Sequence, residues 1–401
     1  MKQGWKKKTF REILEKTETI NPIHYPEKEF EYIDVSSVSN ITFTIEKTQK
    51  IKGKNAPSRA RRLVRINDVI FATVRPTLKR IAVVPDQLDN QICSTGYFVL
   101  RPRSEVNYRF LFYSLFCDDF QKNMEKLQKG ASYPAVTDND VRNQVLSFPP
   151  LPEQQRIVDI LDQSFAAIDQ AIENTISNAN NSKEIFESFL NQIFTSLFVN
   201  NPIKKINEVN TIRPPKNEAK DQLAGNSLVS FAPMEDLGIN QIFLIPNKTR
   251  KLNEVYSGYT YFSDNDVLLA KITPCFENGK IGIAKNLKNS IGFGSSEYII
   301  IRRPKHLRQK FLYYYLSRET FRNEGIKYMQ GAVGHKRVPL DFLANYKIPI
   351  PPISKQDEIL NKIDNFFDNT NLLKSNYDNK KELLQELKQS ILHKAFQGEL
   401  S

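Results

Sequence analysis

The stretch Pro149-Pro-Leu-Pro-Glu-Gln-Gln-Arg-Ile157 separates two kinds of sequence in this chain of 401 residues. Upstream of it, short apolar runs rich in β-branched and aromatic residues alternate with turn residues, which is typical of strands. Downstream, residues 153–198 keep a helical period without a proline. Because proline suits the first turn of a helix, Pro152 predicts that a long helix begins at this point.

The same stretch returns as Pro351-Pro-Ile-Ser-Lys-Gln-Asp-Glu-Ile359. Four further blocks repeat in the same order, with offsets that drift from 198 to 202 residues along the chain. They are Asn67–Ala72 with Asn265–Ala270, Ser94–Pro102 with Ser295–Pro304, Phe110–Leu115 with Phe311–Leu316, and Gly130-Ala131 with Gly331-Ala332. A period this long excludes a solenoid and indicates two copies of a domain-plus-helix unit, residues 1–200 and 201–401.

Each copy is predicted to begin with a mixed α/β domain of about 150 residues. The expected strands are Val69–Val74, Ile81–Val84 and Tyr97–Leu100, with Ile281–Ala284 and Tyr298–Ile301 in the second copy. Short helical segments are expected at Arg109–Lys126 and Arg308–Lys327.

Each copy is predicted to end in a long helix with a heptad seam. The seam positions are Leu161, Phe165, Ile168, Ile172, Phe186, Leu190, Ile193 and Leu197, and in the second copy Leu373, Tyr377, Leu384, Leu387 and Ile391. A 46-residue helix would be about 69 Å long. Two such seams in one chain favour antiparallel pairing with approximate two-fold symmetry.

The apolar pattern weakens at residues 173–183, which include four asparagines, Asn174, Asn178, Asn180 and Asn181. We interpret this segment as a stutter with a solvated face. The alternative is a polar layer that fixes the register or receives a partner.

Charge divides the chain into four segments. Residues 1–152 carry 25 Lys and Arg against 17 Asp and Glu, and residues 201–352 carry 23 against 13. Residues 153–200 carry 2 against 7, and residues 353–401 carry 7 against 8. The excess of +12 therefore lies on the two α/β domains, which indicates a polyanionic partner, usually nucleic acid.

The most basic segment, residues 47–80, has Asp68 as its single acidic residue. Arginine suits bidentate contacts to guanine, and lysine suits contacts to phosphate. Two glycine-led loops at equivalent positions, after Gly130 and Gly331, also carry polar side chains that could reach DNA. The candidate DNA-binding residues are Lys54, Arg59, Arg61, Arg62, Arg65, Arg75, Lys79, Arg80, Ser132, Tyr133, Lys271, Lys280, His335, Lys336 and Arg337. The alternative interpretations are a solvated basic loop before a strand and plain connectors.

Several other function classes find little support in the sequence. Three widely spaced cysteines and four histidines give no metal-binding or disulfide spacing, which favours idle thiols in a reducing cytoplasm. No secretory signal or apolar run of membrane-spanning length is expected. No phosphate-binding glycine loop, S-adenosylmethionine fingerprint, methyltransferase signature or nuclease-like carboxylate set is found, so we expect no catalytic, cofactor or metal site.

The doubled proline–glutamine motif, the glycine loops before it and the C-terminal Gln389-Ser-Ile-Leu-His-Lys-Ala-Phe-Gln-Gly-Glu-Leu400 resemble those of specificity subunits of Type I restriction–modification systems. The second copy departs from the pattern, with Ser354 and Lys355 in place of Pro152 and Glu153, which could alter partner contacts. The resemblance covers essentially the whole chain. It implies two target-recognition domains, residues 1–152 and 201–352, and two spacer helices, residues 153–200 and 353–401.

The resemblance also implies a non-catalytic DNA reader in the prokaryotic cytoplasm. Each domain would read one half of an asymmetric, bipartite target in double-stranded DNA. Two copies of a modification subunit would bring S-adenosylmethionine and adenine flipping. Restriction-translocase subunits, where present, would bring ATP and Mg²⁺.

Two other hypotheses remain open from the residues alone. One is a stand-alone nuclease or methyltransferase with an unrecognised site. The other is a coiled-coil adaptor whose basic domains bind nucleic acid without sequence preference, with affinity set by salt alone.

Overall fold

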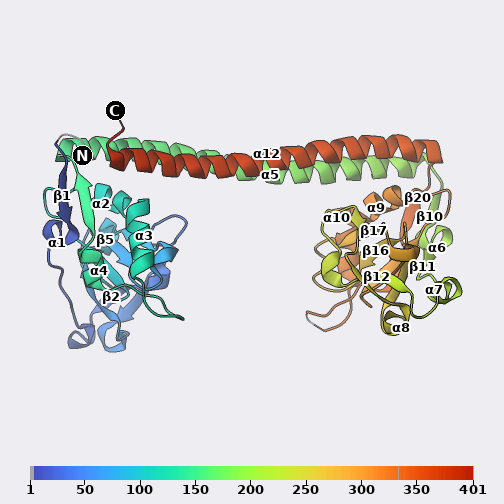
Figure 1. Ribbon diagram of the computed structural model, residues 1–401, viewed down its shortest axis with the longest axis horizontal. Coiled ribbons are helices and arrows are strands. Elements are labelled where there is room, and N and C mark those ends of the chain that lie inside the picture. The colour runs from blue at the N-terminus through green and yellow to red at the C-terminus, as the bar shows by residue number, and fades with distance from the viewer. Residues whose placement is uncertain (1–3, 333, 401) are drawn as a thin grey trace. The chain divides into compact units, whose positions relative to one another are not determined.

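The computed structural model describes residues 4–332 and 334–400. The chain forms two compact units (Figure 1). Unit 1 comprises residues 1–175 with 379–401, and unit 2 comprises residues 176–378. Each unit holds one α/β part together with a part of helix α5 (Leu151–Asn200) and a part of helix α12 (Ile353–Gln397).

The described α/β part of unit 1 is built from short strands with four α-helices. Its strands are β1 (Lys6–Thr9), β2 (Glu29–Ile33), β3 (Gln49–Lys52), β4 (Ala60–Val64), β5 (Val69–Ala72), β6 (Ile81–Val83), β7 (Gln91–Ser94), β8 (Tyr97–Leu100) and β9 (Val145–Phe148). Its helices are α1 (Phe10–Ile13), α2 (Tyr108–Ser114), α3 (Asp118–Leu127) and α4 (Asp138–Arg142). The described strands form sheets in the orders β3-β2-β7-β4, β6-β5-β8 and β1-β9. Strands β2 and β7 are parallel, and the other neighbours are antiparallel.

Unit 2 repeats this plan with additional strands. Its strands are β10 (Ile203–Lys205), β11 (Thr211–Ile212), β12 (Leu228–Ala232), β13 (Phe243–Leu244), β14 (Lys248–Lys251), β15 (Thr260–Ser263), β16 (Val267–Ala270), β17 (Ile281–Ala284), β18 (Ile291–Gly294), β19 (Tyr298–Arg302) and β20 (Lys347–Pro349). Its helices are α6 (Ile206–Val209), α7 (Asn217–Gln222), α8 (Leu252–Val255), α9 (Gln309–Ser317), α10 (Glu319–Tyr328) and α11 (Leu340–Asn345). The described sheets have the orders β11-β19-β16-β17-β13, β14-β12-β18-β15 and β10-β20.

The mixed α/β class predicted from the sequence is confirmed, with some changes at the element ends. The strands predicted at 69–74 and 81–84 end earlier, at residues 72 and 83. The first ends early because the chain turns at Arg75, whose φ is +50°. The helical segments predicted at 109–126 and 308–327 are each two helices, since Leu115–Cys117 and the extended backbone of Arg318 interrupt them.

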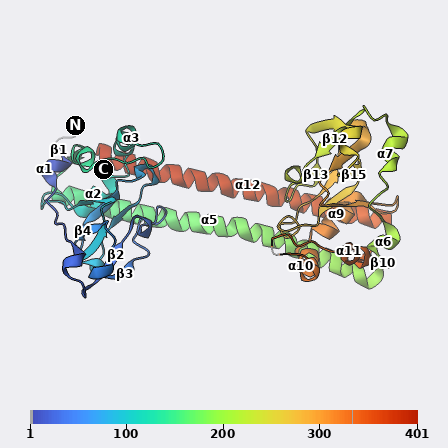
Figure 2. The same ribbon diagram turned by 90° about the horizontal axis from the view of Figure 1, so that it is seen from below.

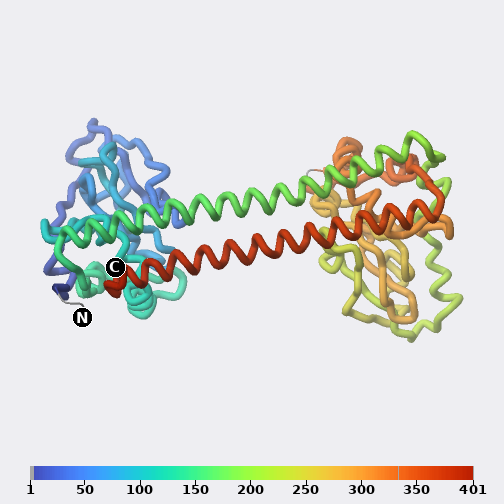
Figure 3. Tube along the Cα trace, turned by 90° about the horizontal axis from the view of Figure 1, so that it is seen from above, coloured from blue at the N-terminus to red at the C-terminus, as the bar shows by residue number. Residues whose placement is uncertain are grey.

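Both long helices contribute to the hydrophobic cores of the units. In unit 1, Leu161 of α5 and Leu392 of α12 belong to the same buried cluster as Phe110 of α2. Within each unit the two helices lie side by side (Figures 2 and 3). Each α/β part therefore buries part of its apolar surface against helices from two distant stretches of sequence.

The buried positions of helix α5 are seven residues apart from Leu161 to Ser182, and Leu190 and Leu197 are buried further along. Leu161, Ile168, Thr175 and Ser182 are all buried. The hydroxyl groups of Thr175 and Ser182 donate to carbonyl groups four residues earlier, at 2.7 and 2.9 Å. Most of residues 173–183, including the four asparagines, are exposed, as expected for a solvated face, while Thr175 and Ser182 are buried.

Helix α12 differs from its predicted seam at two positions. Tyr377, Leu384 and Ile391 are partly buried, but Leu373 and Leu387 are each 47% exposed. The next residue, Lys388, contacts α5 instead. Its ammonium group lies 2.7 Å from Asp169 and 4.7 Å from the centroid of the Phe165 ring. A lysine stem covers an apolar side chain at this position while its charge is paired.

The proline–glutamine motif has the same structural role in both units. The side chains of Gln154 and Gln356 are fully buried, and each bonds three backbone groups. Gln154 accepts from the N–H of Asn107 at 2.8 Å and donates to the carbonyls of Glu105 and Pro149 at 2.9 and 2.8 Å. Gln356 accepts from the N–H of Arg308 at 2.8 Å and donates to the carbonyls of His306 and Pro351 at 3.0 and 2.9 Å. Each glutamine thus fastens the start of a long helix to its α/β part.

Replacing the first of these glutamines, Gln154→Ala, is expected to lower the free energy of unfolding by about 2–3 kcal/mol, because it leaves buried backbone groups without partners. Urea denaturation followed by circular dichroism measures the loss. The neighbouring exposed Gln155→Ala is the control and should cost less than about 1 kcal/mol. Equal losses for the two variants would show that the buried hydrogen bonds are not the reason for the motif.

Candidate nucleic-acid interface

Two loops of unit 1 meet beyond the end of β5. One loop, residues 73–80, joins β5 to β6, and the other, residues 128–137, joins α3 to α4. The N–H of Arg75 donates to the carbonyl of Pro134 at 2.7 Å, and the N–H of Val136 donates to the carbonyl of Thr73 at 2.9 Å. We call residues 73–80 with 129–136 the loop edge of unit 1.

The loop edge of unit 1 brings together five predicted DNA-binding residues. They are Arg75, Lys79, Arg80, Ser132 and Tyr133. Gly130, with φ +101°, allows the second loop to turn back on itself, since a Cβ there would lie 3.1 Å from the carbonyl oxygen of Tyr133.

Arg75 and Tyr133 form a stacked pair at this edge. The guanidinium lies 5.0 Å from the centroid of the Tyr133 ring. Arg75 is exposed, and Tyr133 is 72% exposed. An exposed cation–π contact is worth about 0.5–1 kcal/mol, enough to orient both side chains without burying them.

Arg80 has a different environment. Its guanidinium donates to the carbonyls of Ser36, at 3.4 Å, and Val38. The equivalent residue of unit 2, Lys280, donates to the carbonyl of Met234 at 2.8 Å. Both cations therefore hold a neighbouring loop in place.

The three arginines of β4 and its approach, Arg59, Arg61 and Arg62, differ in their availability to a ligand. The carbonyl of Arg59 accepts from the N–H of Thr95 at 2.8 Å, and its exposed side chain makes no hydrogen bond or ion pair with the described residues. Arg61 donates to the carbonyl of Ala60 at 2.9 Å. Arg62 is paired with Asp138, with both carboxylate oxygens within 3.0 Å of one nitrogen.

Two predicted residues lie away from the loop edge. Lys54 follows β3 and pairs with Glu27 at 2.9 Å. Arg65 precedes β5, at the opposite end of that strand from Arg75, and pairs with Glu18 at 2.6 Å. The structure therefore does not bring these two residues to the edge that carries Arg75 and Tyr133.

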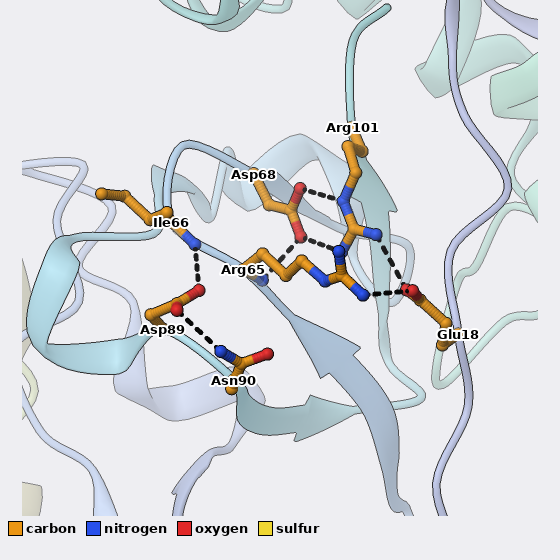
Figure 4. Close-up of polar contacts among 7 residues, drawn as sticks. All are labelled: Glu18, Arg65, Ile66, Asp68, Asp89, Asn90 and Arg101. Atoms are coloured by element: carbon orange, nitrogen blue, oxygen red, sulfur yellow. Dashed lines mark hydrogen bonds and ion pairs between the residues drawn. The ribbon is translucent and has the colours of Figure 1, made fainter.

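Arg65 belongs to a network around a buried carboxylate (Figure 4). The side chain of Asp68, 1% exposed, accepts from Nε and a terminal nitrogen of Arg101 and from the N–H of Arg65, each at 2.8 Å. Glu18 pairs with both arginines. The hydrogen bonds of Arg101 with Asp68, and then that with Glu18, raise the pKa of Arg101. The charge of Arg101 is therefore paired with carboxylates inside the fold.

Unit 2 has a loop edge of the same design, formed by residues 271–280 with 330–332 and 334–338. The N–H of Thr273 donates to the carbonyl of Lys336 at 2.9 Å, and the N–H of Val338 donates to the carbonyl of Lys271 at 2.9 Å. This arrangement brings five predicted residues to one edge: Lys271, Lys280, His335, Lys336 and Arg337. The side chains of His335 and Lys336 are exposed and bond to none of the described residues.

A carboxylate that the sequence did not suggest organises this second edge. Glu297 accepts from Arg337 at 2.8 and 2.9 Å, and its carboxylate lies 3.8 Å from the ammonium of Lys271. The hydrogen bonds from Arg337 lower the pKa of Glu297. Burial lowers the pKa of Lys271, while the charge of Glu297 opposes that shift. The repeated blocks could have revealed this residue, since Glu297 replaces Gly96 within one of them.

The described residues contain neither a metal-binding cluster nor a membrane-spanning helix. Among residues 4–332 and 334–400, no three His, Cys, Asp or Glu side chains are grouped so that they could hold a metal ion. In the same ranges, no helix is long and apolar enough to cross a membrane.

Comparisons with known proteins agree on one family. Residues 2–178 and 199–386 match the family described as Type I restriction modification DNA specificity domain. The EcoEI specificity subunit of Escherichia coli is 36% identical over 157 residues, which are 39% of this chain and 26% of that protein. The EcoAI specificity subunit of Escherichia coli is 35% identical over 159 residues, which are 39% of this chain and 26% of that protein. The chain thus spans about a quarter of the length of these two relatives.

Two solved structures resemble the whole chain. The HsdS subunit from Thermoanaerobacter tengcongensis aligns with a TM-score of 0.67 and 29% identity, covering 100% of this chain and 98% of that one. A chain from a study of complex assembly and conformational transition of the type I R-M system aligns with a TM-score of 0.83 and 28% identity, covering 99% of both chains.

Proposed function

Because this chain belongs to the Type I restriction modification DNA specificity family, we propose that it is the subunit that chooses the DNA target of such a system. Each unit reads one half of an asymmetric, bipartite site. The observation that carries the proposal is the pair of loop edges. They are built on equivalent backbone hydrogen bonds but present different side chains, as two readers of different half-sites require.

The proposed organisation has four segments. Residues 1–152 and 201–352 are target-recognition domains, and residues 153–200 and 353–401 are spacer helices. We propose that the helices pair as an antiparallel coiled coil with a two-fold pseudo-repeat, so that their length sets the number of unread base pairs. The contact of Lys388 with Asp169, and that of Phe366 with Phe189 at 4.3 Å between ring centroids, support this pairing.

The chain itself is proposed to make no covalent bond. Two copies of a modification subunit bind it and supply S-adenosylmethionine, and restriction-translocase subunits add ATP-dependent cleavage with Mg²⁺. The complex acts on double-stranded DNA in the prokaryotic cytoplasm. Within this complex, the DNA-binding residues proposed from the sequence remain candidates, and those of the two loop edges are the ones whose side chains lie together.

A binding selection tests the proposal. The chain, in complex with its modification subunit, is incubated with random-sequence duplex DNA, and the bound molecules are sequenced. We expect two separated, different half-sites with a fixed gap. Binding that falls steeply with salt but enriches no sequence would instead identify a nonspecific coiled-coil adaptor.

A further inference from the structure

The two loop edges can be compared position by position, because the same backbone hydrogen bonds recur in both units. The N–H of Thr73 donates to the carbonyl of Gly96 at 2.8 Å in unit 1. The N–H of Lys271 donates to the carbonyl of Glu297 at 3.0 Å in unit 2. Thr73 therefore corresponds to Lys271, and Gly96 corresponds to Glu297.

A third pair of positions corresponds in the same way. Ala135 exchanges two backbone hydrogen bonds with Lys129, both 2.9 Å long. Arg337 exchanges two with Gln330, at 3.0 and 2.8 Å. Three neutral residues at one edge thus occupy the places of three charged residues at the other: Thr73, Gly96 and Ala135 against Lys271, Glu297 and Arg337.

In unit 2, the carboxylate of Glu297 holds the side chain of Arg337 in one position. Glu297 accepts from Nε of Arg337 at 2.9 Å and from one terminal nitrogen at 2.8 Å. The other terminal nitrogen donates to the carbonyl of His335 at 3.0 Å. Lys271, held by the carbonyl of Ser296 at 3.0 Å, lies on the other side of the carboxylate. A long side chain held in this way loses less conformational entropy when it binds.

The fixed arginine keeps two donors for a ligand. A guanidinium has five N–H groups. Three of those of Arg337 are used by Glu297 and His335, which leaves one on each terminal nitrogen. The side chain is 45% exposed. One donor on each terminal nitrogen can serve the two acceptors, O6 and N7, that guanine presents in the major groove.

A phosphate is a poorer match for this group than a base edge. The carboxylate of Glu297 neutralises part of the guanidinium charge and so weakens its attraction for a phosphate, whereas the neutral guanine edge needs only hydrogen-bond donors. Lys336, the residue before Arg337, has no such carboxylate among its described contacts and suits a phosphate better.

We propose that Arg337, held by Glu297 and Lys271, reads one guanine in the half-site of unit 2, and that this three-residue group makes the two half-sites differ at that position. This inference rests on the proposed function. The neutral trio of unit 1 cannot supply the same contact. A side chain at Gly96 would begin with a Cβ 2.6 Å from Cγ2 of Val35, so unit 1 excludes a carboxylate there.

The test repeats the binding selection with three variants and a control from the same loop. Arg337→Ala is expected to reduce the preference for guanine at one base pair about tenfold and to leave every other position of both half-sites unchanged. Glu297→Gln should weaken the same preference and no other. Lys336→Ala, the control, should weaken binding to all sequences alike without changing the motif.

The variant Arg337→Lys distinguishes a lost base contact from misfolding, because it keeps the charge and the aliphatic stem but loses the bidentate fork. It should bind the modification subunit normally, melt near the wild-type temperature and still show a weakened guanine preference. An unchanged motif with Arg337→Lys, or a loss spread evenly over all positions, would overturn the inference. If the wild-type chain enriches no bipartite motif, the proposed function fails instead, so the two failures are distinguishable.

Discussion

Charge reversal at two arginines of unit 1, Arg59→Glu with Arg75→Glu, is expected to reduce DNA affinity at fixed salt by about a hundredfold or more, since each lost arginine contact is worth roughly 1–3 kcal/mol. Neither guanidinium is paired with a carboxylate of the described residues, so the fold should tolerate both changes. Fluorescence anisotropy with the target duplex measures the loss. The dependence of affinity on salt should also become shallower, because fewer counterions are released.

The control is Lys183→Glu, an exposed residue of α5. It lies outside both loop edges, and its reversal should change affinity little. Arg62, which the basic segment also suggests, is a poor choice for this test. A carboxylate at that position would face Asp138 and disturb folding as well as binding. Equal losses from the paired arginine variant and from Lys183→Glu would refute the division of charge between domains and helices.

Removing the buried carboxylate of unit 1, Asp68→Ala, is expected to lower the free energy of unfolding by about 3–5 kcal/mol, as when one partner of a buried ion pair is lost. The side chain of Arg101 is only 12% exposed and would lose two of its hydrogen bonds, and the N–H of Arg65 would lose its acceptor. Urea denaturation of the purified chain measures the change in the transition of unit 1.

Unit 2 offers a matched test of the same contact. Asp266 is 2% exposed and accepts from Arg302 and from the N–H of Ser263, each at 2.8 Å. Asp266→Ala should therefore cost about as much as Asp68→Ala. Asp86→Ala, at an exposed position, should cost less than about 0.5 kcal/mol. A loss below 1 kcal/mol at both buried positions would show that these ion pairs are not important for stability.

The order of elements could be predicted well from the sequence, because it depends on local patterns. Strand β8 and strand β17 have their predicted ends. The long helix begins at Leu151, one residue before the proline that predicts it. The seam of α12 could not be predicted as well, since Leu387 and Lys388 both fit a helical pattern between Leu384 and Ile391 and their exposure depends on the neighbouring helix.

The candidate interface was predictable in part. The glycine-led loops do carry the residues that meet at the two loop edges. The partners of the basic residues were not predictable, because they come from distant positions. Arg62 pairs with Asp138, 76 residues away, and Arg65 pairs with Glu18, 47 residues away. Such pairs form only in the tertiary structure. They determine which cations stabilise the fold and which remain available to bind DNA.

The measurement that tests the central claim most directly is a map of methylated adenines in DNA from cells that express the modification subunit with this chain and from cells that lack the chain. A two-part, asymmetric motif that appears only when the chain is present is the predicted result. If the complex assembles but no new motif appears, or if the same motif is methylated without the chain, then the chain does not choose the target.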